Sequence, residues 1–326
     1  MPRRLTILDV GHGNSAVLED TKGVLIIDAG PKSGLLEYLT EQEITKINVV
    51  LLSHADQDHI AGLLNLLNSD LFEIGRIRIN SDELKDSAIW GDLLYELDLA
   101  REVGDVDFEP SLTPDDSGEF DQGTVHIEIL GPSSDLVEKG PGSKDDKGRR
   151  IGTNSISAII RLSQKMKPIA LLPGDLDEIG LDDLIEHNID ASAPLLVFPH
   201  HGLKAGRTIA MDEFTHRLCE IVRPSKVIFS IGRGRKAPMP EVVAAIREHV
   251  PDVRIACTQL SEHCAFSLPQ EAPSHLNDVF SKGREHQKCC AGTIVIDLDN
   301  PEYMLPIYDA HKAFIENAAP NALCLK

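Results

Sequence analysis

The stretch VVLLSHADQDHIAGL, residues 49–63, joins an apolar run to a dense set of metal-binding side chains. The run VVLL indicates a buried strand, and the residues from Ile60 onward have the apolar spacing of a helix. Between them, six residues contain four side chains of ligand type: His54, Asp56, Asp58 and His59. Carboxylates buried without partners are strongly unfavourable, and a divalent cation removes that cost. The stretch therefore predicts a metal-binding loop between a strand and a helix.

Three further segments end an apolar strand pattern on a residue of the same type. They are LIIDAG with Asp28, IALLPGDL with Asp175, and LLVFPHHG with His200 and His201. Strand ends from distant parts of a chain can meet at one pocket, and ligands that converge in this way are usual in catalytic metal sites. We therefore expect these segments to build one catalytic centre.

The rest of the chain alternates strand patterns with helical ones. Antiparallel strands are expected in LTILDV, SAVLED and GVLIIDAG, and seven more strands between residues 125 and 299. Helices are expected at residues 34–44, 60–69, 177–187, 212–222 and 240–249. This alternation predicts an α/β protein, a four-layer αβ/βα sandwich with two sheets inside and helices outside.

We find no low-complexity linker that would divide the chain. A single domain over residues 1–326 is expected, with a Cys/His-containing C-terminal elaboration at about 257–326. The Gly-, Ser- and charge-rich residues 133–152 are expected to form a long mobile loop.

Composition limits the possible partners and locations. The formal net charge is −20, so a polyanionic substrate needs a local basic patch. No run of about 18 apolar residues is present, which argues against a membrane span. The N-terminal apolar segment is too short for a signal peptide, so a cytoplasmic protein is expected. Its six cysteines are then expected to be thiols or metal ligands, not disulfides.

The order of these motifs resembles the metallo-β-lactamase fold superfamily of metal-dependent hydrolases. Within it, the chain looks most similar to the hydrolase domain of bacterial competence DNA-uptake channel proteins and its free-standing relatives. The resemblance rests on DVGHGNS, VLIIDAG, SHADQDHIAGL, TNSISAIIRL, LLPGDL and FPHHGL, which occur in that order. Several motifs in one order are far more specific than any single motif.

The resemblance implies two divalent metal ions held by His54, Asp56, Asp58, His59, Asp175 and His200. In that scheme the first two belong to one ion, the next two to the other, and Asp175 bridges both. The residues implied to act in catalysis are Asp58, His59, Asp175 and His201. Two residues are implied to support the site without binding metal strongly: Asp28 orients the metal loop, and Asn154 approaches it.

The chain departs from the superfamily pattern in three places. Asp56 stands where His is usual, Asn154 lies in the region that usually supplies a separate His, and GRGRKAPMP has no His where the competence subgroup often does. The site is thus richer in oxygen ligands, which moves preference from Zn²⁺ towards Mn²⁺ or Mg²⁺.

A pair of metal ions activates water for hydrolysis, and no GxSxG nucleophile motif is present. Basic residues follow two of the strand ends: Lys204 with Arg207, and Arg233, Arg235 and Lys236. A basic rim favours a phosphodiesterase, above all a nuclease acting on DNA or RNA. Two alternatives stay open, a hydrolase of small phosphodiesters such as cyclic nucleotides, and a catalytically degenerate binding subunit that engages a protein partner.

Cysteine and histidine also gather in CTQLSEHCAF and REHQKCCAGT. A structural Zn²⁺ is one interpretation, with ligands Cys257, Cys264, Cys289 and Cys290. Buried free thiols are the other interpretation, because the spacing does not match a C-x-x-C knuckle.

Overall fold

Strands β3 (Gly23–Ala29) and β4 (Lys46–Leu52) are buried on both faces in the computed structural model, which describes residues 2–31, 33–102, 104, 106–206, 208–270 and 273–325. In β3, Leu25 packs in a core between two sheets, and its neighbour Ile26 packs in a second core under helices. Strands buried on both faces need apolar side chains at every position, which explains the continuous runs VLII and VVLL.

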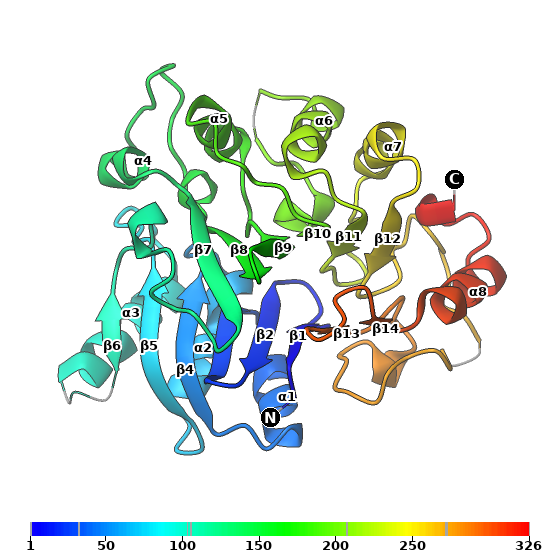
Figure 1. Ribbon diagram of the computed structural model, residues 1–326, viewed down its shortest axis with the longest axis horizontal. Coiled ribbons are helices and arrows are strands. Elements are labelled where there is room, and N and C mark those ends of the chain that lie inside the picture. The colour runs from blue at the N-terminus through cyan, green and yellow to red at the C-terminus, as the bar shows by residue number, and fades with distance from the viewer. Residues whose placement is uncertain are drawn as a thin grey trace.

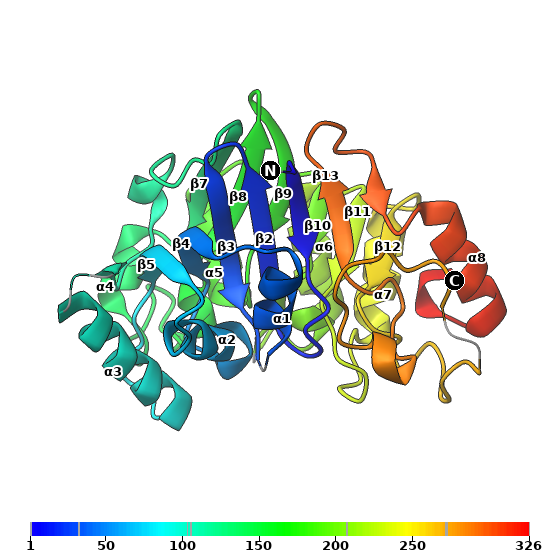
Figure 2. The same ribbon diagram turned by 90° about the horizontal axis from the view of Figure 1, so that it is seen from below.

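The two sheets pack face to face (Figures 1 and 2). The first has the order β14-β13-β1-β2-β3-β4-β5-β6 and the second the order β12-β11-β10-β9-β8-β7. In the first sheet the remaining strands are β1 (Arg4–Ile7), β2 (Ser15–Asp20), β5 (Glu73–Ile79), β6 (Asp107–Glu109), β13 (Ile294–Asp297) and β14 (Met304–Leu305). The second sheet consists of β7 (Val125–Gly131), β8 (Ile159–Gln164), β9 (Lys167–Leu172), β10 (Leu195–Val197), β11 (Lys226–Phe229) and β12 (Arg254–Cys257).

Helices cover the outer face of each sheet. Apolar residues of α1 (Gly34–Glu41), α2 (Gln57–Leu67) and α3 (Ala88–Glu102) complete the core outside the first sheet. Those of α5 (Glu178–Glu186), α6 (Met211–Val222) and α7 (Pro240–His249) complete the core outside the second. The expected four-layer sandwich is therefore confirmed (Figure 1). Helix α8 (Tyr308–Ala318) packs beyond β12, near the C-terminal end of the chain.

Strand direction determines where the ligand residues gather. Strands β3 and β4 run parallel, and so do β9, β10 and β11. Carboxyl ends of neighbouring parallel strands lie at the same edge of a sheet. The chain leaves β4 at the HADQDH loop, β9 at the Gly-Asp turn and β10 at the His pair. The C-terminal part joins the first sheet, because β13 pairs with β1 from Arg4↔Asp297 to Ile7↔Ile294.

Three segments differ from expectation. Helix α2 begins at Gln57, so Asp58 and His59 lie in its first turn instead of in the preceding loop. Residues 70–121, for which no structure was predicted, add β5, α3 and β6. The expectation of a loop throughout residues 133–152 is wrong for α4 (Ser134–Lys139), whereas residues 140–152 form turns and irregular structure with an Arg149–Asp145 ion pair. None of the helices in the described ranges is both long and apolar enough to span a membrane.

Candidate metal centre

Three of the expected ligands form a compact group, which we call the buried group: His54, His59 and Asp175. His59 Nε2 lies 3.1 Å from Asp175 Oδ1, and His54 Nε2 lies 3.7 Å from Asp175 Oδ2. Both imidazoles are 0% exposed and Asp175 is 3% exposed. The three ligand atoms lie within 4.8 Å of one another, which is close enough for all of them to bind one ion.

Neighbouring side chains orient both imidazoles of the buried group. His59 Nδ1 lies 2.8 Å from Asp28 Oδ2, and His54 Nδ1 lies 2.9 Å from Ser53 Oγ. Asp28 also accepts a 2.7 Å hydrogen bond from the Ser53 amide, which fixes the start of the loop. With each Nδ1 engaged, each Nε2 is directed to the metal position, the usual arrangement for a metal-binding histidine. The structure thus places Asp28 where its expected orienting role requires.

The buried group fits a divalent cation. His54 Nε2, His59 Nε2 and Asp175 Oδ1 are fully buried, and the described residues supply none of them with a hydrogen-bond partner. Each such atom costs about 1–3 kcal/mol, so three in one place require compensation. A bound divalent ion would coordinate all three atoms, which lie within 4.8 Å of one another.

The charges around His59 lead to the same conclusion. Burial alone would lower its pKa, but the carboxylates of Asp175 and Asp28 outweigh burial and raise that pKa well above the usual value. Burial would raise the pKa of Asp175, but the imidazoles of His59, His201 and His54 hold it well below its usual range. The carboxylates around His59 thus favour positive charge at this position, which a bound divalent ion would supply in place of a proton.

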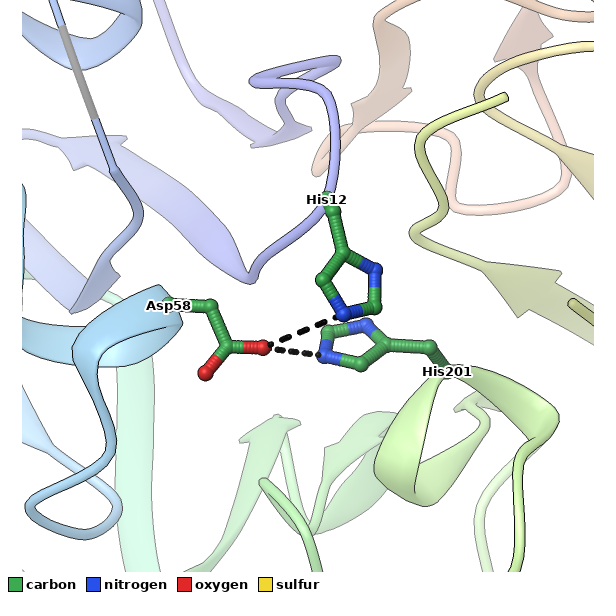
Figure 3. A group of neighbouring side chains, drawn as sticks. All are labelled: His12, Asp58 and His201. Atoms are coloured by element: carbon green, nitrogen blue, oxygen red, sulfur yellow. Dashed lines mark hydrogen bonds and ion pairs between the residues drawn. The ribbon is translucent and has the colours of Figure 1, made fainter. Parts of the chain in front are cut away.

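A second group, which we call the cleft group, contains His12, Asp58 and His201 (Figure 3). Asp58 Oδ2 lies 3.1 Å from His201 Nε2 and 3.5 Å from His12 Nε2. His201 Nδ1 donates a 2.7 Å hydrogen bond to the carbonyl of Ser230, which leaves its Nε2 available as a ligand. Burial and the nearby His201 lower the pKa of His12 to about 4, so its imidazole is neutral and able to coordinate.

Asp175 lies against both groups, because its Oδ1 atom is also 3.9 Å from His201 Nε2. The groups are therefore adjacent, and the arrangement allows for two ions with Asp175 between them. It pairs the ligands differently from the resemblance. His59 lies with His54 in the buried group, and Asp58 lies with two histidines from other segments.

Sequence reasoning missed His12. DVGHGNS contributed to the resemblance, but its histidine was given no ligand role, although it lies in the loop that follows β1. Gly13 (φ 135°) allows the loop to reach the site, since a Cβ there would lie 2.4 Å from the carbonyl oxygen of Asp58. The adjacent Asn14 amide donates to that same carbonyl at 3.1 Å. A histidine between two glycines directly after a strand was the sequence signal.

The His pair lies in an unusual turn. His200 and His201 both adopt left-handed backbone conformations, with φ of 51° and 57°. Such conformations cost about 1–3 kcal/mol each in non-glycine residues and concentrate at functional sites. The turn buries His201 beside Asp58 and leaves His200 partly exposed, with its Nδ1 3.9 Å from Asp175 and 3.3 Å from Asn154 Nδ2. The geometry thus favours His201, where the sequence favoured His200 as the ligand.

Asp56 lies at the margin of the buried group. Its Oδ2 atom is 3.4 Å from His54 Nε2, and its other oxygen pairs with the ammonium of Lys85, in the segment before α3. Burial would raise the pKa of Asp56, but His54 and Lys85 lower it to about 2. The carboxylate is thus ionised and shared between a lysine and a candidate ligand.

A cleft of about 640 Å³ opens beside the cleft group and is lined by His12 and Asp58. Of the expected substrate-binding residues, Arg233 and Arg235 line this cleft, whereas Lys204 and Lys236 do not. Arg207 lies outside the described residues. Two lysines and a histidine that sequence reasoning did not select also line the cleft: Lys282, Lys288 and His286.

The cysteines lie apart from this centre. A small enclosed cavity is lined by Cys257, Cys264, Cys290 and Cys324, whereas Cys289 Sγ lies 3.3 Å from Ser281 Oγ. Burial raises the pKa of the Cys257 and Cys290 thiols well above the usual value. In the described parts of the chain, the groups close enough to hold an ion contain no cysteine. A structural zinc therefore stays a prediction, and Cys289, one of its four expected ligands, does not line the cavity that the other three share.

Comparison with known proteins identifies the fold. The sequence profile described as Metallo-beta-lactamase superfamily matches residues 8–142. A search of curated proteins found no match. Among solved structures, a metal-dependent hydrolase of the beta-lactamase superfamily is 17% identical with a TM-score of 0.48, and the match covers 78% of this chain and 95% of that chain.

Two further solved structures are similar to this chain at low identity. The metallo-beta-lactamase fold protein YhfI from Bacillus subtilis is 12% identical, with a TM-score of 0.48 and coverage of 78% and 96%. The short form of human tRNase Z is 13% identical, with a TM-score of 0.42 and coverage of 77% and 96%. The profile match and the four-layer arrangement of two sheets between helices together show that this chain has the metallo-β-lactamase fold.

Proposed function

We propose that this protein is a metal-dependent phosphodiesterase that acts on DNA or RNA. The observation that carries the proposal is the juxtaposition of the two ligand groups at Asp175 with a cleft lined by cationic side chains. The ligand groups supply the means of hydrolysis, and the cleft supplies the preference for a phosphate ester.

Two divalent ions would be held by the six residues of the buried and cleft groups. Bound there, the ions supply Lewis acidity and lower the pKa of water. We expect Mn²⁺ or Zn²⁺, with Mg²⁺ as a further candidate, because the ligand set combines imidazoles with carboxylates. Asp56 and His200, which lie at the margin, are available as additional ligands at closer approach.

The protein's own groups hold and orient this centre. The Ser230 carbonyl holds His201 with Nε2 facing Asp58, and Asp28 holds His59 with Nε2 facing Asp175. His12 and Asp58 line the cleft and their side chains are partly exposed, whereas His54 and His59 are fully buried. The cleft group would therefore hold an ion beside a phosphate ester bound in the cleft.

The chemistry of the surroundings supports a phosphate ester over a lactam or thioester. The chain as a whole carries −20, yet the only carboxylate among the described residues that line the cleft is Asp58, a candidate metal ligand. Cationic side chains around a metal pair stabilise the charge that develops on a phosphate during cleavage. The likeness of the motifs to a hydrolase domain of DNA-uptake channels adds support for DNA.

The test is cleavage of single-stranded DNA, double-stranded DNA and RNA by purified protein supplied separately with Mn²⁺, Zn²⁺ or Mg²⁺. We expect cleavage of at least one polymer with at least one metal, and its loss in the His59→Ala variant. His187→Ala, which alters an exposed histidine distant from the site, is the control and should cleave as the wild type does. Absence of cleavage with every polymer and metal would contradict the proposal.

The cleft volume favours one alternative. About 640 Å³ lies within the usual range of about 300–1,000 Å³ for small-molecule sites, so a cyclic nucleotide is a second candidate substrate. A kcat/KM higher for cyclic nucleotides than for oligonucleotides would support it. Metal analysis tests the third candidate, a degenerate binding subunit: fewer than one divalent ion per chain after purification with Mn²⁺ or Zn²⁺ would favour that role.

A further inference from the structure

One wall of the cleft comes from a segment near the C-terminal end of the chain. Residues 281–289 place Lys282 and Lys288 on this wall, and Arg235 lies on the wall that follows β11. In the described parts of the chain, none of these three side chains has an ion-pair partner. The chain has 52 acidic and only 32 basic residues, so acidic partners for a cation are abundant elsewhere. Three unpaired cations at one cleft therefore indicate a site for an anionic ligand.

A buried carboxylate fixes this wall to the candidate metal centre. Asp9 is 0% exposed, and its Oδ2 accepts hydrogen bonds from Ser281 Oγ at 2.9 Å and from the Gly283 amide at 2.8 Å. The Asp9 carbonyl accepts from the Lys282 amide at 2.9 Å. Asp9 begins the loop that carries His12, so one residue positions both a candidate ligand and the lysine wall.

The opposite wall is fixed by the same network. Asp9 Oδ1 accepts from Gln259 Nε2 at 2.9 Å, and Gln259 Oε1 accepts from the Arg233 amide at 2.9 Å. The Arg233 guanidinium donates to the Leu260 and Ala265 carbonyls, so it braces the wall instead of facing a substrate. Gly232 allows close approach, because a Cβ there would lie 2.6 Å from the His12 amide nitrogen.

We propose that Lys282, Lys288 and Arg235 form a phosphate track that binds the backbone of a single nucleic-acid strand next to the cleft group. The inference rests on the proposed function for the reaction that follows binding. Three cations from two segments exceed what one phosphodiester charge requires, which favours a polymer over a cyclic nucleotide. No Phe, Tyr or Trp is present among the described residues that line the cleft, so contacts fall on phosphates and binding is independent of sequence.

The experiment measures binding of a fluorescent 20-nucleotide oligothymidylate by anisotropy, in EDTA so that no cleavage occurs. The variants are Lys282→Ala/Lys288→Ala and Arg235→Ala. The matched control is Lys22→Ala/Lys167→Ala, which removes two exposed lysines outside the cleft lining, one in a turn and one at the start of β9. We expect at least a tenfold rise in Kd for the double variant, a smaller rise for Arg235→Ala, and no change for the control.

Salt dependence gives a second readout. Each lost phosphate contact reduces the slope of log K against log salt by about 0.7 for single strands, so the double variant should lose about 1.4. An unchanged Kd and slope in the double variant would overturn the inference.

A small substrate separates this inference from the proposed function. With metal present, the double variant should lose at least tenfold more activity on the oligonucleotide than on bis(p-nitrophenyl) phosphate. Equal losses of activity on the two substrates would overturn the phosphate-track proposal. The wild-type protein could bind the oligonucleotide more tightly than the double variant and yet cleave neither substrate. That result would support the phosphate track and contradict the proposed function.

Discussion

In the buried group, each imidazole is fully hidden from solvent and has its Nδ1 atom engaged by Ser53 or Asp28. The cleft group is partly open to solvent, because the side chains of His12 and Asp58 are 20% and 25% exposed. Its His201 is locked by a carbonyl, but His12 Nδ1 has no hydrogen-bond partner in the described parts of the chain. The two groups share one carboxylate and differ in how firmly their other ligands are held.

This difference indicates that the two groups should bind their ions with different affinities. Ligands held in advance lose little conformational freedom on binding, so the buried group should bind its ion more tightly. The cleft group meets solvent and substrate, so its ion should exchange more readily and should depend more on the substrate being present.

Asp175→Asn should have the largest effect, since the Asp175 carboxylate lies 3.1 Å from His59 Nε2 in the buried group and 3.9 Å from His201 Nε2 in the cleft group. Residues that merely orient ligands cost about 10–100-fold in metal affinity or activity, so we expect a loss of more than about 100-fold in kcat here. Metal content by mass spectrometry should fall at both positions. Two retained ions per chain would contradict the shared role of Asp175.

His12→Ala should separate the two groups. We expect metal content to fall from two ions per chain towards one, with the remaining ion as tightly bound as in the wild type, because the buried group keeps all its contacts. His59→Ala is the matched comparison and should instead release the tightly held ion. If His12→Ala leaves both ions in place, the cleft group is not a metal site.

Asp28→Asn should weaken the buried group by about 10–100-fold in metal affinity without removing a ligand. The substituted side chain would keep one oxygen, which can accept from the backbone N–H of Ser53. Its uncharged NH2 group would then face His59 Nδ1 in place of the carboxylate oxygen, so His59 would lose its fixed orientation. Chelator competition measures the effect. The cleft group should keep its affinity, and equal weakening of both groups would contradict the independence of their supports.

The sequence predicted which strand ends would meet, because hydrophobic runs followed by His or Asp are local features, and the ligand roles of these residues stay predictions. Asp28, His54, His59 and Asp175 all follow this rule, and the structure places them together. His12 was not predicted, because its loop reaches the site through tertiary packing against α2. The sequence favoured His200 over His201 as a ligand, and it could not show the left-handed turn that places His201 in the site. The position of Lys282 and Lys288 in the cleft could not be predicted from local sequence patterns. Residues 281–289 are held there by hydrogen bonds to Asp9, which is distant in the sequence.

Lys85→Met should have the smallest effect and concerns the departure at Asp56. Lys85 neutralises Asp56, whose other oxygen lies 3.4 Å from His54 Nε2, so the lysine charge opposes a cation in the buried group. Removing one nearby charge near the surface is worth about 1 kcal/mol, so divalent affinity should rise about fivefold.

Titration with a chelating dye measures this rise in affinity. The control is Lys46→Met, which breaks the exposed ion pair with Glu73. A gain for Mn²⁺ that exceeds the gain for Zn²⁺ would mean that Asp56, once released, acts as an oxygen ligand. Weaker binding would mean that Lys85 holds Asp56 in the position that the ion needs.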